Sequence, residues 1–475
     1  MRAAPPLRAA ARPLCTSAKP SCDTRFDKMS KAAAKKESGK TNWQKICSAV
    51  VDGIRPVTSR LAPVLAAEKR AHAMVYGYLA GGCDAERSLR RSVVAFDDLE
   101  LRHAVLHGVG HGEVDVSTTI LGIPAKQPFF ITSCAGQRMF HADGEVATAK
   151  AAKKHGLAMA LSQLTTSTFE DVREAHPDGA KCLQLYVWRD RVLLKEVLDR
   201  AKAVGFTSLA LTADFSWVGN RERETRTGFT VPPSYSVRQC IDALKSPAWT
   251  FDYMSRVPYG YKAVPDADFP AESLVDFIAA QMKVSPVLTL PWDVPSLPEF
   301  DWKDAEWLCS EWGDVGPVAL KGVASGKDAV RALDSGFKAI WVSNHGGRQL
   351  EDSVATIDTH MPPDRASPCP PKSVRAAVGP DVEVILDGGV RRGVDVVKAL
   401  ARGADSVACG RAYLFGLAAG GETGVNKALD LIERDVALAM GLLGCRTVKV
   451  SWPAFMKPAW LSCEGVLFRA LVTRI

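Results

Sequence analysis

Eight short apolar segments recur along this chain, with helical patterns between them, and this repeat constrains the fold most strongly. The segments span residues 128–134, 158–162, 182–187, 208–214, 317–323, 339–345, 382–387 and 406–410. Strands that alternate with helices form parallel sheets, and eight such units over about 290 residues fit a closed barrel. The sequence therefore predicts an α/β fold of the (β/α)8 TIM-barrel type.

Polar side chains stand at or near the carboxyl ends of these segments, where a barrel of this type keeps its active site. Polar residues without a shared role would be scattered over both ends of the strands. The residues concerned are Ser162, Gln184, Tyr186, Thr212, Asp214, Lys321, Ser343, His345 and Asp387.

The segment AIWVSNHGGRQL, from Ala339 to Leu350, is the most informative of the eight. Its apolar run stops at a histidine, His345, which can accept a proton near neutral pH. Arg348 follows three residues later and offers a planar fork for a carboxylate. The paired glycines between them let the backbone approach a ligand closely. A purely structural histidine is the alternative, but the combination predicts a site for a small organic acid.

A second segment, VEVILDGGVRRGVDVVKALARGADSVACGRAYLFG, combines a strand, a helix and another strand with glycines at both strand ends. Backbone N–H groups, a helix N-terminus and an arginine form a phosphate cradle, and the last two strands of such barrels commonly build one. Two glycine turns with solvated arginines are the alternative. No GxGxxG motif occurs in the chain, so a nicotinamide dinucleotide fold has no support.

The motifs SNHGGRQ, LDGGVRRG and QLYV, in their order along the chain, resemble the FMN-dependent L-2-hydroxy acid dehydrogenase and oxidase family. This family includes glycolate oxidase and the flavin lactate dehydrogenases. The resemblance runs from about Ala71 to Val450. The segments FDWKDAEWL, GNRERETRTGFTVPP and GRAYLFGLAAGGETGV are most similar to the respiratory L-lactate dehydrogenase branch.

The resemblance implies catalytic roles for several residues. His345 matches the base that removes a proton from the substrate, and Asp214 matches the carboxylate that steadies the protonated imidazole. Arg348 and Arg221 match the two arginines that hold the substrate carboxylate. Two tyrosines, Tyr78 and Tyr186, match residues whose hydroxyls hydrogen-bond the substrate, although either could be an ordinary core tyrosine.

The resemblance also implies an FMN site. Lys321 matches the lysine near flavin N1 and O2, where a fixed cation stabilises the reduced flavin. Residues expected at the ring or the ribityl chain are Ala135, Ser162, Gln184, Thr212 and Ser343. Residues expected at the ribityl chain and phosphate are Asp387, Gly389, Arg391, Gly410 and Arg411.

Some positions depart from the family pattern. After the first strand this chain has residues 132–136, TSCAG, where a proline is usual. Leu164 stands where glycolate oxidase carries a tryptophan, which slightly favours lactate. Residues 360–373 hold five prolines and predict a surface insertion, and the tail 451–475 has no counterpart in the family.

The net charge of +7 arises entirely from residues 1–40, which contain ten Lys/Arg and three Asp/Glu, and the remainder carries fifty of each. The folded part is therefore neutral, and nucleic-acid binding has no support. Residues 1–22 are basic and contain no acid, as in a mitochondrial transit peptide. A plastid signal and a disordered basic tail are the alternatives. The C-terminus does not match the SKL peroxisomal address.

The cysteine spacing and the apolar runs of the chain limit the kinds of structure that it can form. The twelve cysteines form no CxxC motif, which argues against a metal site and a disulfide scaffold, and no apolar run is long enough to span a membrane. A peripheral membrane contact stays compatible with the sequence. The expected organisation is a targeting segment at 1–40, a helical cap at 41–127, a barrel at 128–450 with a lid-like or docking excursion at 225–300, and the tail.

The sequence thus predicts an FMN-dependent dehydrogenase that oxidises an L-2-hydroxy acid, with L-lactate favoured. Because no haem domain is visible in the chain, its electrons are expected to pass to a separate cytochrome or quinone. An oxidase that forms H₂O₂ from O₂ is the first alternative. An FMN isomerase or nucleotide dehydrogenase would not require His345 with Arg348 and Arg221, and a flavin-binding scaffold without turnover is the remotest alternative. The family resemblance implies a homo-oligomer.

Overall fold

The structure is a computed structural model that describes residues 61–110, 112–188, 190–229, 236–255, 262, 300–359, 373–449 and 456–458. The predicted targeting segment lies outside the described residues. So do residues 360–372 of the proline-rich insertion, most of the excursion beyond residue 255, and most of the tail.

Eight parallel strands form one sheet in the order β4-β11-β10-β9-β8-β7-β6-β5, and a bridge between Ile131 and Met159 joins its two ends. This is the predicted barrel, and all eight predicted strands are confirmed. The strands are β4 (Phe129–Ile131), β5 (Ala160–Ser162), β6 (Cys182–Leu185), β7 (Ser208–Thr212), β8 (Val318–Val323), β9 (Ala339–Val342), β10 (Glu383–Leu386) and β11 (Ser406–Cys409).

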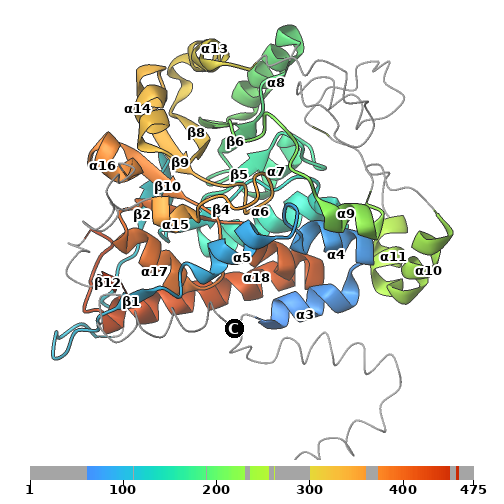
Figure 1. Ribbon diagram of the computed structural model, residues 1–475, viewed down its shortest axis with the longest axis horizontal. Coiled ribbons are helices and arrows are strands. Elements are labelled where there is room, and N and C mark those ends of the chain that lie inside the picture. Colours follow the sequence, from blue (N-terminus) through green and yellow to red (C-terminus); the bar gives the residue numbers. More distant parts are fainter. Residues whose placement is uncertain are drawn as a thin grey trace, which may run out of the picture. The chain divides into compact units, whose positions relative to one another are not determined.

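A helix follows each strand and covers the outside of the barrel (Figure 1). These are α6 (Gly144–His155), α7 (Phe169–Ala175), α8 (Arg191–Val204), α13 (Trp302–Trp312), α14 (Gly326–Asp334), α16 (Val374–Val378), α17 (Gly393–Ala401) and α18 (Arg411–Leu442). Short helical pieces also occur at η1 (Gln137–Met139), η2 (Gly313–Val315) and α15 (Thr356–Thr359).

The predicted N-terminal cap contains three described helices, α3 (Leu61–Arg70), α4 (Ala73–Ala80) and α5 (Arg87–Val94). Helix α3 packs along α18, and α4 packs against α18 and α9 (Glu222–Thr227) (Figure 1). The side chain of His72 accepts a hydrogen bond from the Met74 amide and caps α4 at its start. The N-terminal cap region places the end of α4 next to the loops that follow β7 and β9.

The barrel interior explains why the polar residues gather at one end. Side chains alternate between the two faces of a strand, so every second residue points inward. An apolar interior cluster includes Ala160, Cys182, Ala210, Ala319, Trp341 and Ile385. Two residues further along the same strands stand Ser162, Gln184, Thr212, Lys321, Ser343 and Asp387. The strand period therefore aims all six polar side chains at the carboxyl-end mouth of the barrel.

A hairpin covers the opposite end of the barrel. Strands β2 (Thr118–Ile120) and β3 (Ile123–Ala125) pair antiparallel, and their apolar side chains join the interior cluster. The Leu121 amide donates to the carboxylate of Glu383 at the start of β10. Burial raises the pKa of Glu383 to about 7. The hairpin closes this end, so access to the barrel is left to the carboxyl-end mouth.

The excursion after β7 begins with α9, α10 (Val237–Lys245) and α11 (Pro247–Met254). In the tail, β12 (Met456–Pro458) pairs antiparallel with β1 (Leu99–Leu101) and returns the chain to the cap. Among the described residues, no helix combines the length and the apolar character needed to cross a bilayer.

Candidate active site

His345 and Asp214 meet at the mouth of the barrel. Strand β9 ends at Val342, and His345 adopts a positive φ of 54° while its amide donates to the Ser343 hydroxyl at 3.1 Å. This turn brings Nδ1 of His345 to 3.2 Å from Oδ1 of Asp214. The ring of Phe215 stacks on the imidazole, with 5.4 Å between the centroids. The base and the carboxylate predicted from the sequence are therefore in contact.

Burial lowers the pKa of His345, and the negative charge of Asp214 opposes this shift only in part. The imidazole is consequently neutral at pH 7, as a base must be. Burial raises the pKa of Asp214, but His345 and Lys321 outweigh it, so the carboxylate pKa is lowered overall. The pair is held as neutral imidazole and anionic carboxylate.

Local packing requires the two glycines after His345. Both have positive φ, and a Cβ on Gly347 would lie 2.5 Å from the Leu89 amide nitrogen. A Cβ on Gly346 would lie 2.8 Å from Nη1 of Arg411. Protein atoms therefore leave no room for a side chain at either position. The turn packs against α5 and carries Arg348 back over the site.

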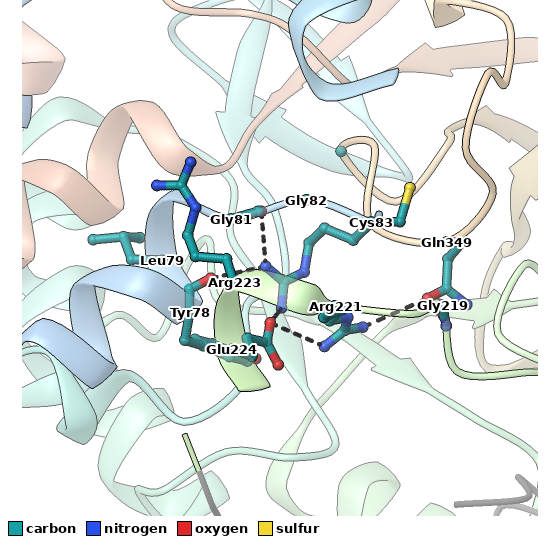
Figure 2. Close-up of polar contacts among 12 residues, drawn as sticks. Tyr78, Leu79, Gly81, Gly82, Cys83, Gly219, Arg221, Arg223, Glu224 and Gln349 are labelled. Carbon is teal, nitrogen blue, oxygen red and sulfur yellow. Dashed lines mark hydrogen bonds and ion pairs between the residues drawn. The ribbon is translucent and has the colours of Figure 1, made fainter. Parts of the chain in front are cut away.

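Arg348 and Arg221 both lie within ion-pair distance of one carboxylate, that of Glu224. Figure 2 shows Arg221 beside Glu224. Nη1 of Arg348 donates to the main-chain oxygens of Tyr78 and Gly81 at 2.8 and 3.1 Å. Its Nη2 donates to Oε1 of Glu224 at 2.8 Å. Nη1 of Arg221 lies 3.6 Å from the same oxygen. The sequence predicted both arginines but not the carboxylate between them.

The two predicted tyrosines line the same region. The guanidinium of Arg348 stacks over the Tyr78 ring at 4.6 Å, and Phe229 stacks on that ring at 4.5 Å. Tyr186 lies 5.1 Å from the Phe215 ring, which in turn is within 5.9 Å of the Arg221 guanidinium. Burial raises the pKa of Tyr186, so its phenol stays protonated and can donate a hydrogen bond.

Lys321 connects the ends of three strands. Its Nζ donates to the Ser343 hydroxyl at 3.0 Å and lies 3.6 Å from Oδ2 of Asp387. Burial lowers the pKa of Lys321, but Asp387 and Asp214 outweigh burial, and the pKa is raised overall. The mouth therefore contains a buried ammonium group that the carboxylates of Asp387 and Asp214 keep charged at neutral pH.

Three other predicted cofactor residues form a hydrogen-bonded row across β5, β6 and β7. Ser162 donates to Oε1 of Gln184 at 3.0 Å, and Nε2 of Gln184 donates to the Thr212 hydroxyl at 2.9 Å. Ala135 lies in the turn after β4, where the side chain of Gln137 donates to the Cys134 carbonyl and the Tyr413 hydroxyl donates to the Thr132 carbonyl. The unusual TSCAG turn is thus fixed by a glutamine and a tyrosine.

The predicted phosphate residues lie after β10 and β11. Gly389 has a φ of 87°, and a Cβ there would lie 1.9 Å from the Ser92 carbonyl oxygen, so packing against α5 requires glycine. Gly410 precedes α18, whose first residue is Arg411. The hydrogen bonds of Arg411 go to the carbonyls of Leu79, Gly81 and Gly346. It therefore reaches across the mouth toward α4, an orientation that the sequence did not predict.

The charges and unsatisfied atoms of this mouth fit FMN and an organic acid. Burial lowers the pKa of Arg411 strongly, and the nearby positive charges of Arg348 and Arg391 lower it further. A phosphate would relieve that repulsion. Several buried polar atoms lack a hydrogen-bond partner among the described residues, and buried polar groups normally have one. They include Thr132 Oγ1, Asp214 Oδ2, Arg221 Nε and Asp387 Oδ1.

Sequence reasoning missed the residues that arrange these groups. Glu224 had a signal in its spacing of three from Arg221 on one helix, whereas Phe215 and Trp341 had none. Trp341 donates from Nε1 to Oδ2 of Asp387 at 2.9 Å. Ligand-type atoms of Cys83, Asp84 and Glu351 also gather within 4.8 Å.

Asn220 donates to Asp84, and the Arg87 amide donates to Glu351. This cluster therefore joins the loop before α5 to its neighbours, and nothing in it indicates a bound ion.

Comparisons with known proteins agree with this geometry. The family model described as FMN-dependent dehydrogenase matches residues 67–457. The chain is 36% identical over 376 residues to the L-lactate oxidase of a Nostoc species, covering 78% of this chain and 90% of the relative. It is 34% identical to a putative L-lactate dehydrogenase of Mycobacterium tuberculosis, covering 80% of this chain and 84% of the relative.

Among solved structures, that of the monotopic membrane protein (S)-mandelate dehydrogenase covers 85% of this chain and 100% of its own, with 28% identity and a TM-score of 0.74. The family model spans far more than half of the chain, and both relatives exceed 30% identity over most of their length. The chain therefore belongs to the FMN-dependent family of 2-hydroxy acid oxidases and dehydrogenases, and it is an oxidoreductase with FMN as its cofactor.

Proposed function

We propose that the protein oxidises L-lactate to pyruvate and passes the electrons to a separate acceptor, a cytochrome or a quinone. One observation carries the proposal: a neutral histidine paired with a carboxylate stands beside two arginines. Phe215 contacts both parts, since its ring stacks on His345 and lies near the Arg221 guanidinium. A 2-hydroxy acid needs a base at its carbinol and a cationic clamp on its carboxylate, and this arrangement offers both.

FMN, when bound, supplies the two-electron acceptor. His345 accepts the substrate proton on Nε2, because Nδ1 faces Asp214. The Asp214 carboxylate then stabilises the imidazolium that forms, since an adjacent anion favours the charged form. Whether that proton comes from the hydroxyl or from the carbon depends on how the electrons travel, and His345 can serve both routes.

Arg348 and Arg221 orient the substrate carboxylate, and the phenols of Tyr78 and Tyr186 donate to its oxygens. Arg221 supports this role because its buried Nε has no partner among the described residues. Fixing the carboxylate aligns the reacting carbon and converts binding energy into rate. Lys321 contributes a fixed positive charge, which would stabilise the negative charge that bound FMN gains on reduction.

The choice of L-lactate rests on the relatives and on one residue. Both curated relatives described above are named for lactate, and Leu164 replaces the bulkier tryptophan of glycolate oxidase. The choice of acceptor is open to one alternative, an oxidase that forms H₂O₂, because the Nostoc relative is named an oxidase and the mycobacterial one a dehydrogenase.

The test is anaerobic reduction of the purified holoenzyme, monitored by flavin absorbance, with L-lactate, D-lactate, glycolate and L-mandelate. The proposal expects the highest ratio of rate to dissociation constant with L-lactate. A tenfold preference for glycolate or mandelate would contradict the substrate. Reoxidation of the reduced enzyme is then timed with O₂, a cytochrome and a soluble quinone, and fastest reoxidation by O₂ with stoichiometric H₂O₂ would establish the oxidase alternative.

A further inference from the structure

Glu224 pairs with both arginines of the carboxylate clamp, and Figure 2 shows its carboxylate facing Arg221. Its side chain is 13% exposed, and those of Arg348 and Arg221 are 12% and 13% exposed. Among the described residues, it is the one carboxylate within ion-pair distance of either arginine. Arg221 is held on its other side by Oε1 of Gln349, at 3.5 Å from Nη2.

The ion pairs around Glu224 determine the net charge of the carboxylate clamp. Lys321 and Asp387 form one pair of opposite charges, and Asp214 adds a negative charge beside the neutral imidazole of His345. Two arginines then share the single negative charge of Glu224. The clamp therefore keeps one net positive charge, which one substrate carboxylate neutralises. Arg411 lies nearby but is assigned to the FMN phosphate, so within the clamp a second substrate carboxylate would find no further arginine and would face Glu224.

We propose that Glu224 makes the site selective for 2-hydroxy monocarboxylates over 2-hydroxy dicarboxylates, acting through Arg348 and Arg221. This inference rests on the proposed function of the clamp. Glu224 is a specificity-determining and positioning residue, since it contacts the arginines that hold the substrate.

The physical reason is the high cost of an unpaired charge in a buried site. With Glu224 neutralised, two buried guanidinium groups face one substrate carboxylate, and a second carboxylate on the substrate supplies the missing charge. Like charges placed together also disfavour the wrong ligand, which is how many sites discriminate. The cost of an unpaired buried charge and the repulsion between like charges both favour monocarboxylates while Glu224 is charged.

Glu224→Gln tests the proposal because it keeps the shape and removes the charge. Glu222→Gln is the matched control, since Glu222 lies on the same helix, is exposed, and pairs at 3.6 Å with Arg226 outside the site. The measurements are the anaerobic flavin-reduction rate and the dissociation constant for L-lactate and for L-malate. We expect Glu224→Gln to reduce the preference for L-lactate by about tenfold or more, mainly through tighter binding of L-malate.

Glu222→Gln is expected to leave the preference unchanged. Equal losses on both substrates in Glu224→Gln would overturn the proposal, because a merely structural glutamate would affect both alike. An equal change of preference in Glu222→Gln would also overturn the proposal, since any negative charge on α9 would then produce the selectivity.

A second comparison needs no variant and no turnover. Propionate and malonate are non-reacting anions of similar size with one and two carboxylates, and their binding to the unchanged holoenzyme is followed by the flavin spectrum. The proposal expects malonate to bind no more tightly than propionate, and tenfold tighter binding of malonate would overturn it. If Glu224→Gln does not fold, this comparison still tests whether the site disfavours a second carboxylate, as the proposal requires. If no 2-hydroxy acid reduced the flavin, the proposed function would fail while the anion comparison still tested that discrimination.

Discussion

Nδ1 of His345 lies 3.2 Å from Oδ1 of Asp214, although 131 positions separate the two residues in the chain. The ends of β7 and β9 bring them together, with β8 between those strands in the sheet. Burial lowers the pKa of His345, and the charge of Asp214 opposes that shift. The two residues together therefore set the pH below which His345 is protonated and can no longer act as a base.

Asp214→Asn should slow flavin reduction and shift its pH dependence. His345 must be neutral to act, so the rate falls as pH drops through its lowered pKa, below the ordinary value of about 6.5. Removing the Asp214 charge lowers this pKa further and weakens the base. Single-turnover reduction from pH 5 to 9 should show the acid limb at lower pH and a plateau reduced by about tenfold or more. Asp381→Asn, an exposed change, is the control, and a limb moved to higher pH would contradict the assignment.

The fold and much of this site could be predicted from the sequence for a physical reason. Alternation along buried strands fixes which side chains point inward, and parallel strands bring their carboxyl ends to one end of the barrel. Lys321 and Ser343, on neighbouring strands, therefore had to lie close together, and Ser162 had to lie at the same end. The position of Glu224 between two arginines could not be derived, because it depends on how the loop before α9 and the turn after β9 pack. The orientation of Arg411 toward α4 depends likewise on tertiary packing.

Lys321→Met should destabilise the protein far more than an exposed lysine would. Lys321 is buried beside Asp387, and its removal leaves a carboxylate for which Trp341 is the remaining hydrogen-bond donor among the residues that the structure describes. Breaking a buried pair from one side costs about 3–5 kcal/mol. Urea unfolding of the apoprotein measures this loss, and Lys338→Met, at an exposed position, should change stability by less than about 0.5 kcal/mol. Similar stability of the two variants would show that Lys321 is not needed to neutralise Asp387.

Arg411→Gln should weaken FMN binding more than riboflavin binding. The two ligands differ in the phosphate, and the positive charges around Arg411 are the groups expected to hold it. Losing one charge-assisted hydrogen bond costs about 1.5–3 kcal/mol, which is roughly 10- to 150-fold in affinity. Fluorescence titration of the apoprotein measures both constants, with Arg434→Gln as a surface control. Parallel losses for FMN and riboflavin would indicate that Arg411 serves the fold.

Arg348→Lys should reduce the preference for lactate over lactamide. Lysine keeps the charge but loses the planar fork, in which Nη1 donates to the carbonyls of Tyr78 and Gly81 while Nη2 donates to Glu224, and a single compact ammonium does not reproduce that geometry. Lactamide lacks the carboxylate and depends less on the clamp. Steady-state kinetics on both substrates, with Arg226→Lys on the exposed face of α9 as control, should show a loss of at least about tenfold confined largely to lactate. If both substrates lost equally, the carboxylate clamp would have to be assigned elsewhere.

His345 acts as the base of the proposed reaction, and anaerobic reduction of His345→Gln by L-lactate tests this role most directly. Glutamine is too weak a base at neutral pH, and removing a positioned general base costs about 10² to 10⁴ in rate. The variant should retain FMN at the unchanged protein's stoichiometry, while the flavin absorbance decays at least about a hundredfold more slowly in stopped flow. Reduction at a near-normal rate by a fully loaded variant would contradict the role of His345 and the mechanism built on it.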